Sequence, residues 1–274
     1  MNVEPAQSTI VVGGHRLEFR WAAPAADGPT LVFLHEGLGC LETWRDVPDL
    51  LAHATGCRAL VYSRLGYGAS DPVVAPRTTR FMHEEALGAL PALLEALDVR
   101  EYLLVGHSDG ASIALIHAAA APKVPGRRLL GLVLEAPHVF VEPICLESIA
   151  ALGRNAASLK TLLRRYHGDN TDRMFDSWVD VWLRPAFSAW TIESLLPLVA
   201  VPALIVQGDE DEYGTQAQVD TIVSGLPIPA EYLLLSHCGH TPHRDEPDRV
   251  RHAMTQFVRR CLGAPVDVLR LDDR

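Results

Sequence analysis

The sequence lacks the features of a membrane, secreted or disulfide-stabilised protein. No run approaches the roughly eighteen apolar residues that a membrane-spanning helix requires. The N-terminus MNVEPAQSTI has no basic stretch followed by an apolar one, so no secretion signal is indicated. The five cysteines are odd in number, widely spaced and never arranged as C-x-x-C, which favours reduced thiols. We therefore expect a cytoplasmic protein with no membrane partner.

Positive charge is also scarce. Lys and Arg number 24 against 34 Asp and Glu, the formal net charge is −10, and the basic residues are scattered. A nucleic-acid partner needs a basic surface for the phosphate backbone, so we expect none. Metal-site patterns are missing as well, because no H-E-x-x-H occurs and Pro242 interrupts helical spacing between His240 and His243. The sequence therefore predicts no metal ion.

The sequence does contain a regular alternation of strand-like and helix-like segments. Of the 274 residues, 48% are hydrophobic, which suffices for a large core. Short apolar runs are typical of strands buried on both faces, and they alternate with longer segments that carry an apolar stripe. The expected strands are residues 31–34, 59–62, 102–105, 130–134, 203–206 and 232–235, after a hairpin over residues 9–19. The expected helices are residues 42–54, 79–97, 216–224 and 247–262, before a tail of about a dozen residues. This order predicts an α/β fold with a mostly parallel central sheet flanked by helices.

Residues 137–197 break this alternation. The segment contains several helix-like patches, no convincing strand, and three of the five tryptophans. We predict a helical cap placed over the strand ends and inserted between two parts of a core domain, residues 1–136 and 198–274. The tryptophans either line an apolar pocket or form the packing core of the cap.

The clearest motif stands between an expected strand and an expected helix. The apolar run at 102–105 leads into Gly106-His107-Ser108-Asp109-Gly110, after which a helical stretch begins. This is G-x-S-x-G in a strand-turn-helix setting, where glycines make room for a tight turn that exposes the serine hydroxyl. The first turn of the helix offers unpaired backbone N–H groups to a negatively charged intermediate. The pattern indicates a nucleophilic serine at position 108.

Other chemically useful side chains also follow expected strands. They lie in residues 35–40, 209–212 and 237–243. Because sites in open parallel sheets form beyond the carboxyl ends of the strands, we expect these segments to meet near Ser108. A serine hydroxyl needs an imidazole to take its proton, and the imidazole needs a carboxylate to fix its tautomer.

Five segments resemble the α/β-hydrolase fold superfamily, in its serine esterase form with a helical cap. They are LVFLHEGLG, SRLGYGASDP, VGHSDGAS, ALIVQGDEDEYG and CGHTPHRDEP, and the resemblance covers nearly the whole chain. It implies that Ser108 is the nucleophile. It also implies that Asp211, three residues after the glycine that ends a strand, is the acid, and that His240 of the Gly-His pair is the base.

Neighbouring carboxylates compete for the role of the acid. Asp209 and Glu212 flank Asp211 and are expected to be solvated loop residues. Glu135, at the end of the preceding strand, is the other alternative, because some members of the superfamily take their acid there.

Neighbouring histidines compete for the role of the base. His237 and His243 are the alternatives to His240, and we expect both to be surface or cap-facing residues. His107, beside the proposed nucleophile, is expected to be a packed structural histidine.

The oxyanion hole implied by the resemblance uses the backbone N–H of Asp109 and a second one from Glu36 or Gly37. Many members of the superfamily have glycine directly after the histidine, whereas this chain has Glu36. A charged carboxylate facing the oxyanion would oppose catalysis. We therefore expect Glu36 either to point away toward a partner such as Arg64 or to contact the substrate. The Asp109 side chain is expected to accept hydrogen bonds at the helix start.

These residues together predict a serine hydrolase that cleaves small to medium-sized, largely apolar carboxylic esters through an acyl-enzyme intermediate, without a cofactor. Hydrolysis of carbon–carbon, amide or thioester bonds is the close alternative. Cofactor-free oxygenation or perhydrolysis, or a ligand-binding protein on the same fold, are alternatives of other classes.

The pocket is the least determined part of the prediction. A homodimer through an edge strand or the cap stays open, as does the choice between pocket lining and packing for several residues. The candidate lining residues are Leu38, Cys40, Tyr67, His138, Trp178 and Trp182.

Overall fold

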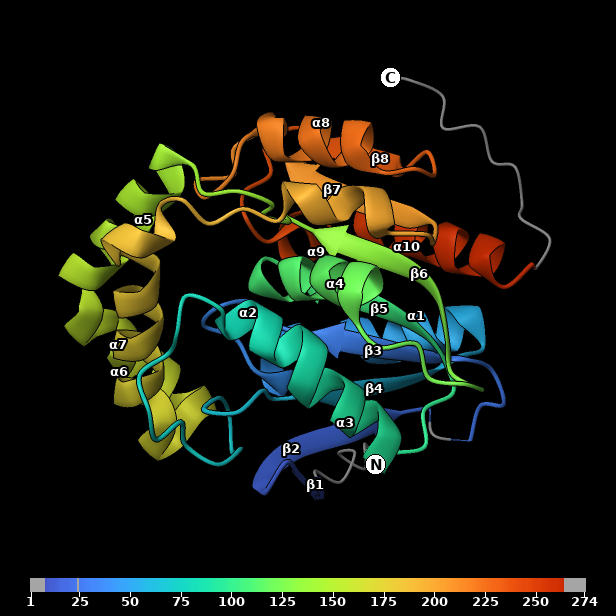
Figure 1. Cartoon of the computed structure of the whole chain (residues 1–274), viewed down its shortest axis with the longest axis horizontal. Helices are drawn as coiled ribbons and strands as arrows, with labels where there is room; N and C mark the ends of the chain where they lie inside the picture. Colours follow the sequence, from blue (N-terminus) through green and yellow to red (C-terminus); the bar gives the residue numbers. More distant parts are fainter. Residues whose placement is uncertain (1–7, 24, 264–274) are drawn as a thin grey trace.

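A central sheet organises the chain in the computed structural model, which describes residues 8–23 and 25–263. Its eight strands are arranged in the order β1-β2-β4-β3-β5-β6-β7-β8 (Figure 1). The strands are β1 (Ser8–Val12), β2 (His15–Ala22), β3 (Thr30–Leu34), β4 (Arg58–Tyr62), β5 (Glu101–His107), β6 (Arg128–Glu135), β7 (Ala203–Gly208) and β8 (Glu231–Leu235). The tail expected at the C-terminus lies almost wholly outside the described residues.

The sheet is parallel except at one edge. β2 pairs antiparallel with β1 and with β4, whereas all other neighbours are parallel. The predicted α/β fold with a mostly parallel sheet is therefore confirmed. All parallel strands end at the same edge of the sheet, which brings the loops after β3, β4, β5, β6, β7 and β8 together.

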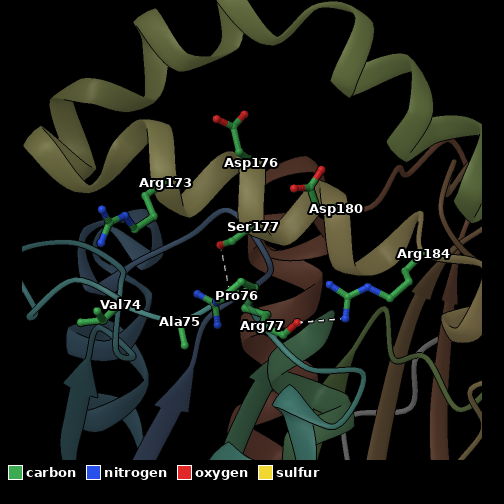
Figure 2. A pocket seen from close by; sticks show the side chains of 9 residues that line it. All are labelled: Val74, Ala75, Pro76, Arg77, Arg173, Asp176, Ser177, Asp180 and Arg184. Carbon is green, nitrogen blue, oxygen red and sulfur yellow. Dashed lines mark hydrogen bonds between the residues drawn. The ribbon is translucent and has the colours of Figure 1, made fainter.

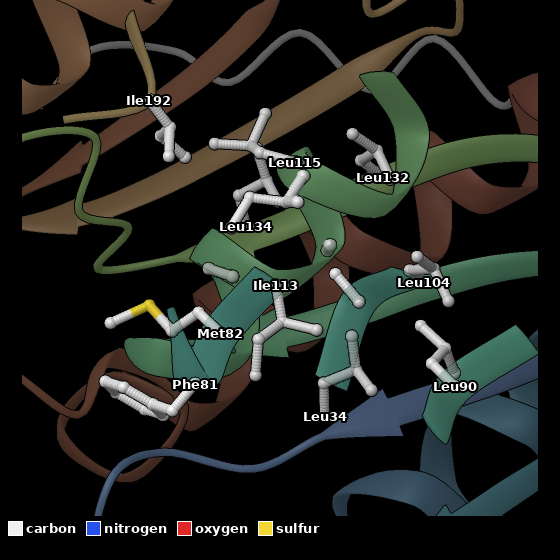
Figure 3. Packing of buried hydrophobic residues seen from close by; sticks show 14 of the residues in the cluster. Leu34, Phe81, Met82, Leu90, Leu104, Ile113, Leu115, Leu132, Leu134 and Ile192 are labelled. Carbon is white, nitrogen blue, oxygen red and sulfur yellow. The ribbon is translucent and has the colours of Figure 1, made fainter. Parts of the chain in front are cut away.

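Helices cover both faces of the sheet, as the continuous apolar strands require. Leu31 and Phe33 of β3 pack on one side with α1 (Val47–Thr55) and α10 (Pro247–Cys261). Val32 and Leu34 face the other side, toward α4 (Asp109–Ala120) and α3 (Leu90–Ala96). Figure 3 shows this second side, where side chains of the sheet interdigitate with those of α2 (Phe81–Glu84), α3 and α4. Side chains of α8 (Gln216–Gly225) also belong to the apolar cluster on this second side of the sheet.

Two of the expected helices are interrupted. The stretch 42–54 consists of a 3-10 turn, η1 (Leu41–Trp44), and α1, because Arg45 adopts a φ of 52° and breaks the helix. The stretch 79–97 contains a π-helical turn, η2 (Glu85–Ala89), between α2 and α3. In α3, Leu93 is buried together with Leu90 and Leu94.

Residues 137–198 form helices without a strand among the described residues, apart from one isolated bridge between Phe140 and Thr191. The main ones are α5 (Pro143–Arg154), α6 (Ala156–His167) and α7 (Thr171–Trp182), which lie together at one end of the sheet (Figure 1). Three short 3-10 turns complete the segment: η3 (Gly168–Asn170), η4 (Pro185–Phe187) and η5 (Glu193–Leu198).

Hydrogen bonds attach this helical segment to loops at the carboxyl ends of the strands. His167 donates from Nε2 to the backbone oxygen of Leu38, after β3, and accepts at Nδ1 from the backbone N–H of Gly68, after β4. Ser148 donates to the backbone oxygen of Glu212, after β7. The helices therefore lie over the edge of the sheet at which the candidate site residues are found. Within the described part of the chain, no helix combines the length and hydropathy needed to cross a bilayer.

Candidate active site

Ser108 occupies the turn between β5 and α4. Its φ of 54° and ψ of −118° lie in a region that side chains rarely adopt, and its backbone N–H donates to the carbonyl of Glu135 at 2.9 Å. The two glycines of the motif are required by close packing. A Cβ at Gly106 would overlap the backbone of Gly110, and a Cβ at Gly110 would overlap the backbone of Leu34. The sequence motif thus produces the tight turn that presents the hydroxyl.

The structure brings Ser108 together with His240 and Asp211. His240 Nε2 lies 2.9 Å from Ser108 Oγ, and His240 Nδ1 lies 2.8 and 2.9 Å from the two Asp211 oxygens. An ionised carboxylate can only accept, so Nδ1 carries the proton and Nε2 accepts from the serine hydroxyl. The arrangement can therefore move a proton from serine to imidazole.

Asp211 is held by hydrogen bonds that sequence analysis missed. The backbone N–H of Tyr213 and the side-chain amide of Gln207 donate to it, each at 2.8 Å. Burial alone would raise the pKa of Asp211, but the hydrogen bond and charge of His240 and the hydrogen bond from the Tyr213 N–H outweigh it and lower the pKa. Asp211 thus stays a carboxylate beside the imidazole. Its neighbours Asp209 and Glu212 are exposed.

A second histidine–carboxylate pair lies in the interior, contrary to prediction. His243 Nδ1 donates to Glu135 Oε2 at 2.6 Å, and both side chains are buried. His243 is therefore neither a surface nor a cap-facing residue, because α9 (Pro242–Asp245) turns it back under the loop against Trp44. Glu135 is not the acid of His240, since its partner is His243. His237, by contrast, is exposed as expected.

His107 stands between the two pairs. It is buried and donates from Nε2 to the backbone oxygen of His240 at 2.6 Å, which ties the elbow to the loop of His240. Candidate ligand atoms of His107, Glu135 and His243 lie within 4.8 Å of one another, a cluster that could in principle hold a metal ion and that sequence analysis missed. The direct hydrogen bond between His243 and Glu135 leaves no room for an ion between those two atoms.

The Glu36 carboxylate has a protein partner, but not the one expected. Its carboxylate lies 3.6 Å from His107 Nδ1 and accepts a 3.4 Å hydrogen bond from Thr43, whereas Arg64 contacts only the backbone oxygen of Glu36. Burial opposes ionisation of Glu36, yet the interaction with His107 lowers its pKa far below the usual range. Burial likewise lowers the pKa of His107, but Glu36 outweighs burial and raises it. The two therefore form an ion pair behind the site.

The Asp109 side chain does not cap its helix, contrary to expectation. Its Oδ2 accepts from Trp178 Nε1 of α7 at 2.9 Å. The same indole packs against Gly37 so closely that a Cβ there would overlap it. In the described part of the chain, the backbone N–H groups of Asp109 and Gly37 donate to no protein oxygen. Two free amides therefore lie near Ser108, under Trp178.

The remaining candidate lining residues are mostly buried. The ring centroid of His138 is 5.8 Å from that of His240 and 5.6 Å from that of Trp182. Tyr67 is fully buried, Leu38 is half-buried, and Trp182 packs on Phe187. The tryptophans of the helical segment belong to the same apolar cluster as the core, which favours packing for Trp182 and Trp190. Ser108 itself is only 5% exposed.

Known proteins resemble most of the chain. The model of the alpha/beta hydrolase family matches residues 31–253. A 2-succinyl-6-hydroxy-2,4-cyclohexadiene-1-carboxylate synthase of Salmonella paratyphi C is 23% identical over 257 residues, covering 84% of this chain and 94% of that protein. The crystal structure of a proline iminopeptidase of Mycobacterium smegmatis matches with a TM-score of 0.70 and 21% identity, over 93% of this chain and 98% of that one. Esterase RhEst1 from Rhodococcus sp. ECU1013 matches with a TM-score of 0.69 and 20% identity, over 93% and 98%. The similar structures share the fold, and the family match extends over well more than half of the sequence, so this chain belongs to the alpha/beta hydrolase family.

Proposed function

We propose that this protein is a serine hydrolase that cleaves carboxylic esters with Ser108, His240 and Asp211. The hydrogen-bonded series from Ser108 Oγ through His240 to Asp211, at 2.9 and 2.8 Å, carries the proposal. Supporting it are the tight turn that presents Ser108 and membership of the alpha/beta hydrolase family.

The reaction follows from the proton positions in this series. Ser108 Oγ attacks the ester carbonyl carbon while His240 Nε2 takes the hydroxyl proton, and Asp211 stabilises the imidazolium that forms. The tetrahedral intermediate collapses as His240 returns the proton to the leaving alcohol, which leaves an acyl group on Ser108. Water, deprotonated by His240 Nε2, then attacks the acyl carbon. As the bond between the acyl carbon and Ser108 Oγ breaks, His240 returns the proton to Ser108 Oγ and the carboxylic acid is released.

The oxyanion of each tetrahedral intermediate would bind to the amides of Asp109 and Gly37. Among the described residues neither group has an acceptor, and they lie at the start of α4 and in the loop after β3. Hydrogen bonds to developing negative charge in such a position contribute about 3 to 4 kcal/mol each to transition-state stabilisation. The ion pair of Glu36 with His107 keeps that carboxylate turned away from the oxyanion.

Residues 137–197 would act as a cap over this centre. Trp178 covers Gly37 and bonds Asp109, while His167 bonds the loops after β3 and β4. The cap excludes water from the serine, which strengthens every polar interaction there. Substrate entry then requires α7 to move away from Asp109.

The decisive experiment is labelling of the purified protein with a fluorophosphonate probe, together with turnover of 4-nitrophenyl esters of increasing acyl length. Wild-type protein is expected to be labelled and to hydrolyse esters. Ser108→Ala should lose labelling, and its kcat/KM should fall at least about 10³-fold because no nucleophile remains.

Ser158→Ala is the matched control, since Ser158 is exposed on α6. It should be labelled and should turn over esters like the wild type. Absence of labelling in well-folded wild-type protein would overturn the proposal. Labelling without ester turnover would keep the nucleophile and point to amide, thioester or carbon–carbon substrates.

A further inference from the structure

Arg64 is a buried cation with unused hydrogen-bond donors. It follows β4, is only 3% exposed, and donates from Nη2 to the backbone oxygen of Glu36 at 2.9 Å. Its Nε and Nη1 are buried without a hydrogen-bond partner among the described residues. A buried donor without a partner costs about 1 to 3 kcal/mol, more when it is charged. Such atoms call for an acceptor that the protein itself does not supply.

A second guanidinium, that of Arg77, belongs to the same cluster. The Cζ of Arg64 lies 4.9 Å from the ring centroid of Tyr67, and the Cζ of Arg77 lies 4.7 Å from it. Arg77 Nη2 and the Tyr67 hydroxyl are also buried and unpartnered among residues 8–23 and 25–263. The three side chains thus offer several unused donors and two positive charges. That combination suits a ligand with anionic oxygen atoms.

The nearby carboxylates do not satisfy these donors. Asp109 and Glu85 interact with both arginines through their charge, but within the described residues neither arginine forms an ion pair with a carboxylate. Asp109 accepts from Trp178, and Glu85 accepts from Tyr62 at 2.8 Å. Burial raises the pKa of both acids, which weakens their hold on the negative charge. The unused N–H groups of the two arginines therefore remain available to hydrogen-bond a ligand.

Arg77 belongs both to this cluster and to a surface cleft. Arg77 lines a cleft of about 380 Å³ between the loop at 74–77 and α7 (Figure 2). Its Nε donates to Ser177 of α7 at 3.3 Å. The next residue, Trp178, bonds Asp109 beside the proposed nucleophile.

The cleft itself carries more positive than negative charge. Arg173 and Arg184 line it with Arg77, against Asp176 and Asp180. Asp176 is engaged by Lys160 at 2.6 Å. Figure 2 shows the two aspartates directed away from the guanidinium groups. An anionic ligand is therefore favoured in the cleft as well as at the cluster of Arg64, Tyr67 and Arg77.

We propose that Arg64, Tyr67 and Arg77 form an anion-binding subsite, and that the substrate carries a carboxylate or phosphate-type group that this subsite receives. The inference rests on the proposed ester hydrolysis and narrows its substrate class. It also revises the sequence-based expectation of a largely apolar substrate, because an ester with an anionic group at the other end of its acyl chain is amphipathic. The unused N–H groups of Arg64 and Arg77 donate charge-assisted hydrogen bonds to the oxygens of such a group.

Matched esters test the subsite. Monoethyl esters of dicarboxylic acids of four to six carbons and ethyl esters of ω-phosphono acids are compared with neutral ethyl esters of equal chain length, by pH-stat titration. Wild-type protein should prefer one anionic series over the neutral series at least tenfold in kcat/KM. Arg77→Gln and Arg64→Gln should each lower this preference at least tenfold, mainly through KM.

Arg165→Gln is the control, since Arg165 is exposed on α6 and its loss changes the net charge equally. It should keep the wild-type preference. Equal turnover of neutral and anionic esters by the wild type, or an unchanged preference in Arg77→Gln, would overturn the subsite. Arg77 is only half-buried, so this variant carries the test if Arg64→Gln does not fold.

Binding measured by calorimetry separates this inference from the proposed reaction. Glutarate and 3-phosphonopropanoate are titrated into wild-type protein, Ser108→Ala and Arg77→Gln. Binding that is lost only in Arg77→Gln supports the subsite even if no ester is cleaved. Fluorophosphonate labelling without anion binding or anionic preference would leave the hydrolase in place and remove the subsite.

Discussion

Two histidine–carboxylate pairs, whose histidines are three residues apart in sequence, have the same local chemistry and different surroundings. His240 donates from Nδ1 to Asp211 at 2.8 Å, and His243 donates from Nδ1 to Glu135 at 2.6 Å. The far nitrogen of His240 faces Ser108 at 2.9 Å. The far nitrogen of His243 is buried without a partner among the described residues.

The difference shows that an oriented imidazole is not sufficient for a reaction centre. Both carboxylates fix a tautomer, but only His240 has a hydroxyl in reach and partial access to solvent. His243 packs against the Trp44 ring at 5.0 Å and contributes to the interior instead. Different effects are therefore expected when the two histidines are changed. Substitution of His240 should lower the rate, and substitution of His243 should lower the stability.

The largest expected effect is that of His240→Gln on rate. Removal of the proposed base should lower kcat/KM for 4-nitrophenyl esters at least about 10⁴-fold, which corresponds to about 5.5 kcal/mol. His243→Gln should keep turnover per folded molecule within about tenfold, since it meets no reacting atom. Both are measured as initial rates, with circular dichroism to confirm folding. A comparable loss of rate in the two variants would erase the distinction between the pairs.

A smaller effect is expected on stability when the interior pair is broken. His243→Leu leaves the buried Glu135 carboxylate without its partner, so the free energy of unfolding should fall by about 3 to 5 kcal/mol. Urea unfolding measures this change. The double variant Glu135→Met with His243→Leu should recover most of it, because no unpaired polar group remains.

The exposed pair of His237 and Glu210, with nitrogen and oxygen 3.0 Å apart, provides the control. His237→Leu should leave the unfolding free energy nearly unchanged. If His237→Leu and His243→Leu lowered the free energy of unfolding equally, burial would not distinguish the two pairs.

The smallest expected effect concerns His138, an imidazole near His240 that bonds no carboxylate of the described residues. Burial, followed by the charge of His240, lowers the pKa of His138 to about 3, although Asp211 acts in the opposite direction and His107 adds to the lowering. The unfolded chain takes up this proton near pH 6.5, so stability from this residue is complete above that pH and falls as the pH decreases toward 3. Between pH 7 and pH 5 the loss should be about 2 kcal/mol.

Urea unfolding of wild-type protein and His138→Gln at both pH values measures this contribution. The variant should lose less stability on acidification, because glutamine takes up no proton in the unfolded state. An identical pH dependence of the two proteins would show that His138 is not held neutral in the folded state.

Local sequence signals were informative wherever function and structure depend on neighbours in the chain. The strand-turn-helix context of Ser108 and the buried strand runs predicted the fold, because backbone geometry and apolar periodicity are local properties. The same reasoning missed Gln207, although its place directly before Gly208 at the end of a strand is a signal. It also assigned the wrong surroundings to His243 and did not foresee the pairing of His243 with Glu135. Nothing in their spacing indicates that residues 108 positions apart meet in the interior.

The sequence by itself determined the alternation of strands and helices, the glycine-flanked turn at Ser108 and the order in which the candidate residues occur. Only the tertiary structure decided which carboxylate each histidine meets, that Glu36 pairs with His107, and that Trp178 reaches Asp109. The physical reason is that a side chain's partner depends on its direction and on packing between distant segments. The orphaned donors of Arg64 and Arg77 became visible in the same way, because an unused hydrogen bond exists only relative to a folded interior.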